Sequence, residues 1–369
     1  MHIDKYVPIL KGKSNDLQAW ALLSPGAKMQ TKPLIELMPT PKNVDVVAHL
    51  QQFLNRINKF ISADSIFVDL YGLLPREKFP NGVDATIEGF GALVGAGIQA
   101  TPTYGFGRND SIWNQLKAVA ERFNSGFCFR IDVDDLDDQA EETWVQILQR
   151  SAELAVPPAR VDLIIDLRYL GDADITQIRQ LVSQFLKMKP SGLAFRSITV
   201  AGSSALKNVT SVPINGNLSI DRSELRAWAQ AYSMAQFGVT SFGDYGVIHP
   251  DFSDGGPNKY INAKIRYTSE SHIQYFRGHG LLHPVKDYEQ YRNLAQSVMQ
   301  SGLYVGANFS AGDQCISDVS QGVGKTGSPG TWVRADMNHH IEYTAHQIVR
   351  LGAKVQNGVL DRETAMLLA

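Results

Sequence analysis

The chain alternates short apolar runs with longer stretches in which apolar residues recur at helical spacing. The runs at 66–68 and 163–165 are continuously apolar, which is typical of parallel strands buried on both faces. Successive runs start roughly 25 to 45 residues apart, the usual length of one strand–helix unit. The eight predicted strands are Tyr6–Lys11, Pro33–Met38, Ile66–Tyr71, Gly97–Thr101, Gly126–Asp132, Val161–Arg168, Ser197–Ala201 and Thr240–Asp244.

Eight such units within about 250 residues predict a (β/α)8 barrel. Helical periodicity between the strands predicts an outer ring of helices. The segments that carry it are 45–60, 112–123, 137–154, 175–188 and 221–237. Barrels of this class place their chemistry at the carboxyl ends of the strands, so these ends indicate where to look for a site.

The alternation stops after Asp244. A turn-rich connector at 250–262 precedes a segment, 263–276, that is predicted to form strands or a hairpin. Helices are expected at 288–299 and from Asn338 to Leu351, with Asn338 as N-cap. The Gly- and Ser-rich stretch 312–330 reads as a loop. We therefore expect a barrel over residues 1–250 and a C-terminal extension, 251–369, that packs over the barrel mouth.

The composition, net charge and cysteine count of the chain favour some classes of protein over others. The 369 residues are 44% hydrophobic and 20% charged, which is ordinary for a soluble globular protein. A net charge of −2 does not indicate a nucleic-acid binder. The two cysteines, Cys128 and Cys315, cannot form a disulfide framework, the first residues lack a signal peptide, and no apolar run is long enough to span a bilayer. We expect a cytoplasmic protein without membrane contact.

Polar residues gather at the predicted strand ends. Converging acids can move protons or bind a cation, and basic side chains can hold an anion. The candidate catalytic acids are Glu36, Asp132 and Asp166. The candidate metal ligands are Asp69, Asp132, Asp166 and Asp244, and the candidate substrate-binding residues here are Lys11, Lys13, Arg130, Arg168 and Tyr245.

Crowded carboxylates repel one another unless they are protonated or bridged. Mg²⁺, or Mn²⁺ with a similar preference for oxygen ligands, would bridge them, so we expect one of these ions to bind. The alternative is structural: Arg130 with Asp132, and Asp166 with Arg168, lie two residues apart and can pair with neighbouring strands as buried salt bridges.

Four shorter motifs could also belong to a functional site, but each is a weak indication of one. Lys11 occupies the place of the Schiff-base lysine in one class of pyridoxal-phosphate barrels, but the accompanying signatures are absent. Gly202-Ser203-Ser204 could cradle a phosphate, although a plain turn explains it as well. The stretch 322–326 lacks the first Gly and the preceding strand of a P-loop. His249 and Asp251 could add a metal ligand, or Asp251 could serve a turn.

A second polar cluster follows near the C-terminus, comprising Trp332, Arg334, Asp336, Asn338, His339, His340 and His346. Its spacing matches no zinc signature. One interpretation is a polar helix start that caps the barrel. In the other, His339 or His340 supplies a proton donor or an anion contact at the mouth, while Trp332 and Arg334 bind substrate.

The combination of Tyr6-Val-Pro-Ile-Leu-Lys-Gly-Lys13, an Asp16-Leu-x-Ala helix, Pro33-Leu-Ile-Glu36 and Trp332-x-Arg334…Asn338-His339-His340 resembles the "beta protein" family. That family is named for a phage T4 protein and occurs in phages and bacterial mobile regions. A related family with a similar opening is encoded beside a putative nuclease in defence-like gene pairs. The resemblance implies a setting of phage–host conflict and names no reaction.

Two functions remain open. The first is a metal-assisted hydrolase or lyase that acts on a phosphorylated or nucleotide-like small molecule. The second is a non-catalytic scaffold or sensor of an antiphage or phage-encoded assembly, with a protein partner such as a nuclease. Acids that converge on an open pocket would favour the enzyme, and salt bridges that fill the mouth would favour the scaffold.

Overall fold

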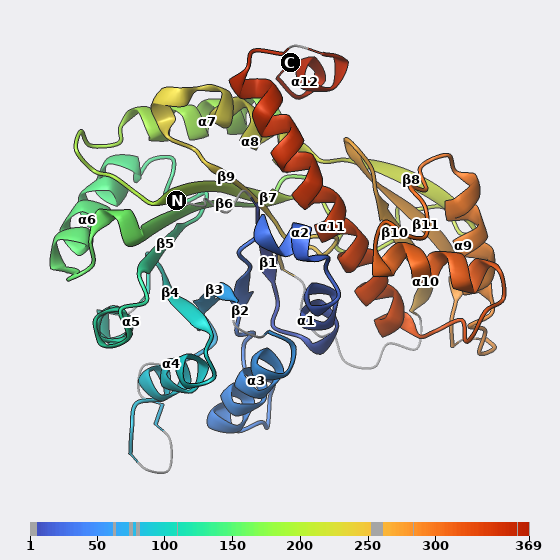
Figure 1. Cartoon of the computed structure of the whole chain (residues 1–369), viewed down its shortest axis with the longest axis horizontal. Helices are drawn as coiled ribbons and strands as arrows, with labels where there is room; N and C mark the ends of the chain where they lie inside the picture. Colours follow the sequence, from blue (N-terminus) through green and yellow to red (C-terminus); the bar gives the residue numbers. More distant parts are fainter. Residues whose placement is uncertain are drawn as a thin grey trace.

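The computed structural model describes residues 6–61, 64–73, 77–78, 82–108, 110–251, 261–282, 284–359 and 361–368. Eight parallel strands close into a barrel at its centre, which confirms the predicted (β/α)8 fold (Figure 1). The barrel closes because the last strand pairs with the first. In order around it lie β1 (Tyr6–Leu10), β2 (Leu34–Glu36), β3 (Ser65–Asp69), β4 (Gln99–Gly105), β5 (Phe127–Ile131), β6 (Val161–Tyr169), β7 (Ser197–Ser203) and β9 (Ser241–Asp244).

The helices of the outer ring begin where the sequence provides caps. The side chains of Asp45, Asp84 and Asp174 each accept a backbone N–H in the first turn of α3, α4 and α7, which stabilises those helix starts. Each helix turns an apolar face to the barrel. The ring includes α3 (Val46–Phe60), α4 (Ala85–Gly95), α5 (Asp110–Phe123), α6 (Ala140–Glu153), α7 (Ile175–Lys187) and α8 (Ser223–Ser233).

Strand alternation sorts the barrel residues into two sets, since successive side chains point to opposite faces. The inward set forms a separate apolar cluster in the barrel interior: Val7, Ile9, Leu34, Phe67, Cys128, Ile164, Ala201 and Tyr245. The outward set packs against the helices in the main core. The next inward positions toward the strand ends are polar, and they form the site described below.

The extension contains a three-stranded antiparallel sheet in the order β10 (Asn262–Thr268), β11 (His272–Gly280), β8 (Gly216–Asp221). The hairpin of β10 and β11 confirms the prediction for 263–276. Because β8 precedes residue 250, the sheet takes one strand from the segment that we had assigned to the barrel. Two helices, α9 (Gln290–Gln300) and α10 (Ala311–Ser320), pack beside this sheet (Figure 1).

The stretch 312–330 is not a loop throughout, since α10 occupies much of it. Ser310 caps α10 by accepting the backbone N–H of Asp313. The small residues that suggested a loop are needed for close packing: a Cβ atom on Gly312 would lie 2.2 Å from the carbonyl oxygen of Ala335. Composition alone could not separate a flexible segment from a tightly packed helix.

The long helix α11 (Pro329–Gln356) corrects two expectations. It begins at the N-cap Ser328, and Asn338 lies in its interior. There the Asn338 side chain accepts the N–H of Gly312 and donates to the carbonyl of Ala19. The helix also does not cover the mouth. It lies against the outer wall, between α8 on one side and α1 (Ser14–Ala21) and α2 (Pro25–Met29) on the other (Figure 1).

The chain continues from α11 into α12 (Arg362–Leu368), which packs on α8. None of the helices in the described ranges has the length and apolar character that crossing a membrane requires.

Replacing Gly312 by Ala should destabilise the contact between α10 and α11, because the added methyl group would collide with the Ala335 carbonyl. We expect a loss of about 1–3 kcal/mol in the free energy of unfolding, measured by chemical denaturation. Gly95→Ala in α4 is the matched control, since no atom lies within 4 Å of its added Cβ. An equal loss in both variants would contradict the proposed close packing.

Candidate functional site

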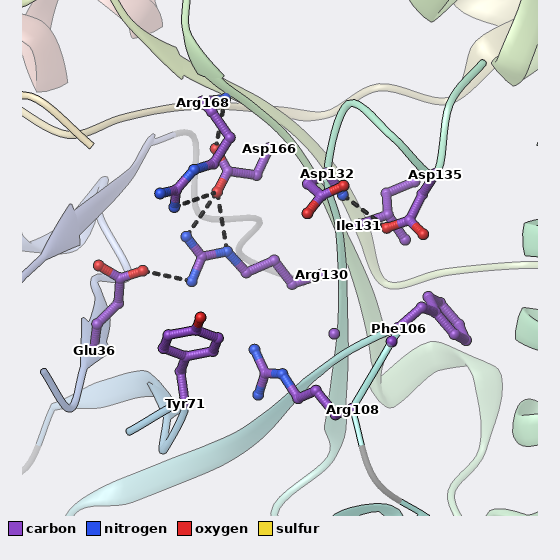
Figure 2. Close-up of a pocket in the computed structure, with 12 residues that line it drawn as sticks. Glu36, Tyr71, Phe106, Arg108, Arg130, Ile131, Asp132, Asp135, Asp166 and Arg168 are labelled. Carbon is purple, nitrogen blue, oxygen red and sulfur yellow. Dashed lines mark hydrogen bonds and ion pairs between the residues drawn. The ribbon is translucent and has the colours of Figure 1, made fainter. Parts of the chain in front are cut away.

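The C-terminal layer of the barrel interior is charged. Five buried residues form it: Lys11 follows β1, Glu36 and Asp69 end β2 and β3, and Arg130 and Asp166 lie within β5 and β6. Strand alternation turns each of them inward. Figure 2 shows the guanidinium of Arg130 between Glu36 and Asp166. Four of the predicted strands therefore contribute to one ion cluster through Arg130 and its carboxylate partners.

Arg130 uses all five of its N–H donors. Its Nη1 donates to Glu36 (2.6 Å) and to Asp69 (2.9 Å). Its Nε (3.1 Å) and Nη2 (2.6 Å) both donate to Asp166, and Nη2 also donates to the hydroxyl of Tyr245 (2.7 Å). One guanidinium thus bridges three carboxylates and a phenol in the centre of the mouth.

Three further cations surround this cluster. Arg108 binds Asp69 with two parallel hydrogen bonds of 2.8 Å. Lys11 donates to Glu36 (2.6 Å) and to the carbonyl of Pro250 (2.7 Å). Arg168 donates to the Tyr245 hydroxyl (3.0 Å) and to Asp251 (2.9 Å). The four cations face the three buried carboxylates, so the charges of the layer nearly balance.

The backbone at Arg168 is strained. Its φ angle is +55°, in the left-handed region that non-glycine residues rarely adopt, and the register of β6 against β7 shifts at this point. The N–H of Arg168 donates to Asp166 at 3.0 Å, which holds the conformation. Such strain persists only where surrounding contacts fix it, and it occurs preferentially at functional sites.

Burial and charge act in opposite directions on the ionisable groups. Burial alone would raise the pKa of Asp69 and of Asp166, but the guanidinium groups of Arg108 and Arg130, and of Arg130 and Arg168, hold these pKa values below the usual range. Burial lowers the pKa of Lys11, which Glu36 only partly offsets. Burial also raises the pKa of Tyr245, so its phenol stays protonated and donates to Asp166 at 2.5 Å.

Two adjoining pockets open above the cluster. One, of about 310 Å³, reaches Arg108, Arg130, Asp166 and the rim residues Asp132 and Asp135. The other, of about 360 Å³, reaches Lys11, His49, Pro250 and Asp251. Both are lined by Glu36, Tyr71 and Arg168. Tyr71 is 65% exposed at their junction, with the Arg108 guanidinium 5.5 Å from its ring centre.

The structure brings together seven of the predicted site residues: Lys11, Glu36, Asp69, Arg130, Asp166, Arg168 and Tyr245. Asp132 lies at the rim instead of in the cluster. It is exposed, and its carboxylate accepts the backbone N–H of Asp134. The mouth also contains Arg108, which we had not predicted. The expected fourth strand ended at Thr101, but β4 continues to Gly105, which places Arg108 in the loop beside Asp69.

Asp244 was expected in the mouth and lies outside the barrel. It is adjacent to the inward Tyr245, so it points outward, where it accepts the hydroxyl of Tyr6 (2.6 Å) and the Nε2–H of His340 (2.8 Å). Arg222 lies 3.7 Å away. Burial raises the pKa of Asp244, but His340 and Arg222 bring it below its usual range. The carboxylate therefore fastens α11 to the barrel wall.

His339 and His340 are both fully buried on the inner side of α11. His339 contacts Asp313 and the carbonyl of Thr268, each at 2.9 Å. Burial lowers the pKa of His340, whose Nδ1 lies 2.7 Å from the Thr268 hydroxyl while its Nε2 faces Asp244. These contacts place both rings in the packing of α11 and not at the mouth.

The remaining candidates lie elsewhere. Trp332 stacks on Tyr291 and donates to the carbonyl of Thr326, and Arg334 donates to Gln18 of α1. Lys13 precedes α1 beside a different pocket. Ser204, from the possible phosphate cradle, donates to Glu224.

The mouth carboxylates are bridged by Arg130. Among the described residues, no group of three or more His, Cys, Asp or Glu side chains is arranged to hold a metal ion. Asp132 and Asp244, two of the four expected ligands, lie away from Asp69 and Asp166. The four predicted ligands therefore do not form one coordination set in this arrangement. Binding of Mg²⁺ or Mn²⁺ stays a prediction, which melting temperatures with and without the ion will test.

The fold and site define a (β/α)8 barrel with a charged, partly open mouth. The chain belongs to the Beta protein family, whose model matches residues 6–346. None of the curated proteins compared with it matches the chain.

The chain is similar to three solved structures at low identity. Triosephosphate isomerase from Bartonella henselae is 12% identical over 66% of this chain and 92% of its own (TM-score 0.34). Alanine racemase from Clostridium difficile 630 is 12% identical over 72% and 59% (TM-score 0.33). The N-terminal domain of a putative aldolase from Bacteroides vulgatus is 11% identical over 96% and 100% (TM-score 0.36).

Removing the Arg130 guanidinium should strongly destabilise the fold, because three buried carboxylates would lose a shared partner. We expect Arg130→Met to lower the free energy of unfolding by about 3–5 kcal/mol, measured by urea denaturation. Arg292→Met is the control, since the ion pair of Arg292 with Glu289 lies near the surface and should contribute less than about 1 kcal/mol. Equal losses would contradict the central role of Arg130.

The difference in stability between the wild type and Arg130→Met should shrink on acidification. The pKa values of Asp69 and Asp166 are depressed in the folded state, so their contribution is present above their ordinary value of 3.8 and is lost as the pH falls through the folded values. Denaturation curves between pH 7 and pH 3 will measure this. A difference that stays constant over the range would show that the ionised carboxylates are not the cause.

Proposed function

We propose that the barrel mouth binds a small anionic molecule and that the protein is a hydrolase or lyase for a phosphorylated or nucleotide-like substrate. The observation that carries this proposal is Arg168. Its side chain is 39% exposed, it lines both pockets, and its strained backbone is held in place by Asp166. A preorganised, accessible guanidinium is suited to a planar pair of hydrogen bonds with phosphate or carboxylate.

The other groups of the mouth differ in whether they are free to bind a ligand. Arg130 lies at the bottom of the mouth with every N–H donor engaged, so it has no donor left for a ligand. Arg168 is tied at the rim to Asp251, whose side chain is 55% exposed. An anionic ligand can therefore replace Asp251 on Arg168 without exposing a buried charge. Arg108 lines the same pocket and would supply a second cation.

Lys11 and Glu36 are the pair that we propose for proton transfer. They lie 2.6 Å apart, and both line the second pocket. Burial lowers the pKa of Lys11, which brings its neutral, basic form closer to physiological pH. In the proposed step the Lys11 ammonium first passes a proton to Glu36. The neutral amine then accepts a proton from water or substrate, and the resulting ammonium returns it to the leaving group.

The scaffold hypothesis stays as the alternative, with a partner such as a nuclease. The saturation of Arg130 supports it, because an ion cluster that satisfies itself can be purely structural. Membership of the Beta protein family supports, for either function, a setting of phage–host conflict.

Arg168→Gln should weaken the binding of inorganic phosphate and adenosine monophosphate to the mouth about tenfold or more, because one charged partner is lost. Isothermal titration calorimetry will measure the affinities. Arg122→Gln on the exposed face of α5 is the control and should leave them unchanged. The same affinity in the Arg168 variant and the wild type would overturn the assignment of Arg168.

Lys11→Arg should keep anion binding within about threefold but lower turnover by about 10²-fold or more, since arginine keeps the charge and cannot act as a base at neutral pH. Mass spectrometry of a panel of phosphorylated compounds incubated with each variant will measure turnover. Ligand binding without turnover of any compound by the wild type would favour the scaffold over the enzyme.

A further inference from the structure

A third pocket, of about 210 Å³, lies at the seam between the barrel and the extension. One wall belongs to the barrel: Lys13 and Asp16 follow β1, Lys207 follows β7, and 247–249 follow β9. The other wall belongs to β10, α9 and the first turn of α11. It shares no lining residue with the two pockets of the mouth.

The charges of this seam pocket favour an anion. Four cations line it, against the single carboxylate of Asp16; they are Lys13, Lys207, Lys264 and Arg266. Lys264 and Arg266 are two residues apart on β10 and so share one face of the strand. The start of α11 adds the positive end of a 28-residue helix, with Pro329, Trp332 and Val333 in the wall.

One nitrogen of the Arg266 guanidinium has no hydrogen-bond partner. The Arg266 side chain is buried, its Nε donates to Asp336 (2.9 Å), and its Nη1 donates to the carbonyl of Val247 (3.0 Å). Its Nη2 is buried without a hydrogen-bond partner. Burial, with Arg266 as a neighbouring cation, lowers the pKa of Lys264 to about 8. Cations held in this way are costly in the free protein, and an anion beside them would offset that cost.

Most of the remaining lining is aromatic or apolar, although Asn15, His249 and Asn262 also belong to it. Trp332 and Tyr291 stack on each other with ring centres 5.1 Å apart, and Ile248, Ile261 and Val333 lie in the same lining. Such walls accommodate an apolar or planar group next to the anion. Free phosphate alone would leave them unfilled.

From this arrangement we propose that the seam pocket is a second ligand site, distinct from the barrel mouth, for a small phosphate- or carboxylate-bearing molecule with a planar apolar body. Lys264, Arg266 and Lys207 hold the anionic group, and Trp332 and Tyr291 border the apolar body. Because the pocket draws on both the barrel and the extension, its ligand would stabilise their contact.

Phenyl phosphate is the probe, used on the full chain that carries Arg168→Gln so that binding at the mouth is weakened. In this background we expect phenyl phosphate to raise the melting temperature and to bind at least several-fold more tightly than inorganic phosphate. Adding Lys264→Met should weaken phenyl phosphate binding about tenfold or more. The melting temperature without ligand should not fall, since the partly buried Lys264 ammonium, which lies beside the Arg266 cation, is removed. Calorimetry and thermal melts will measure both.

Arg122→Gln in the same background is the matched control and should leave phenyl phosphate binding unchanged. Unchanged affinity in the Lys264→Met variant would overturn the seam site. Lys207→Met provides a second test in case Lys264→Met unfolds, and it should weaken binding in the same direction. Lys264→Met is also made in the chain that keeps Arg168. There we expect phenyl phosphate binding at the seam to weaken while inorganic phosphate still binds at the mouth, so the two proposals can fail independently.

Discussion

The guanidinium of Arg130 is the interaction on which the organisation of this barrel depends. It links side chains from β2, β3, β5 and β6 with Tyr245 at the end of β9. Three carboxylates around one cation leave an excess of negative charge in a buried layer, which low polarity makes costly. Lys11, Arg108 and Arg168 supply the compensating charge. Lys11 does so from within the buried layer, whereas the more exposed Arg168 does so from the rim.

A second polar layer lies on the other side of the same barrel wall. Tyr6, Asp244, Arg222 and His340 meet there, and they fasten α11 between α8 and the first two helices. Neighbouring residues at the end of β9 belong to the two layers, since Asp244 faces outward and Tyr245 inward. This division explains why the polar His340 is buried: its contact with Asp244 holds α11 against the barrel wall.

The sequence predicted the fold better than the site. Buried parallel strands are continuously apolar, so their positions could be read directly, and the charged residues that interrupt their ends indicated the mouth. In a continuously apolar strand no alternation of polar and apolar residues marks which side chains face the barrel interior. For this reason the sequence placed Asp244 in the mouth with Asp166. Arg108 was missed because β4 extends beyond its apolar start. Asn338 and 312–330 were misread because helix packing, which the local sequence does not show, decides their conformation.

Lys11 joins the two candidate binding regions. Its ammonium binds Glu36 in the mouth, while its backbone N–H donates to Asp16, which lines the seam pocket. The segment 247–251 makes a second connection: Val247 accepts from Arg266 at the seam, and Pro250 accepts from Lys11. Spatial connection alone does not establish energetic coupling, which requires an element with two arrangements that both ligands bias. The rim ion pair between Arg168 and Asp251 is the best candidate for such an element. It is partly exposed, it lies at the end of this segment, and its disruption exposes no buried carboxylate.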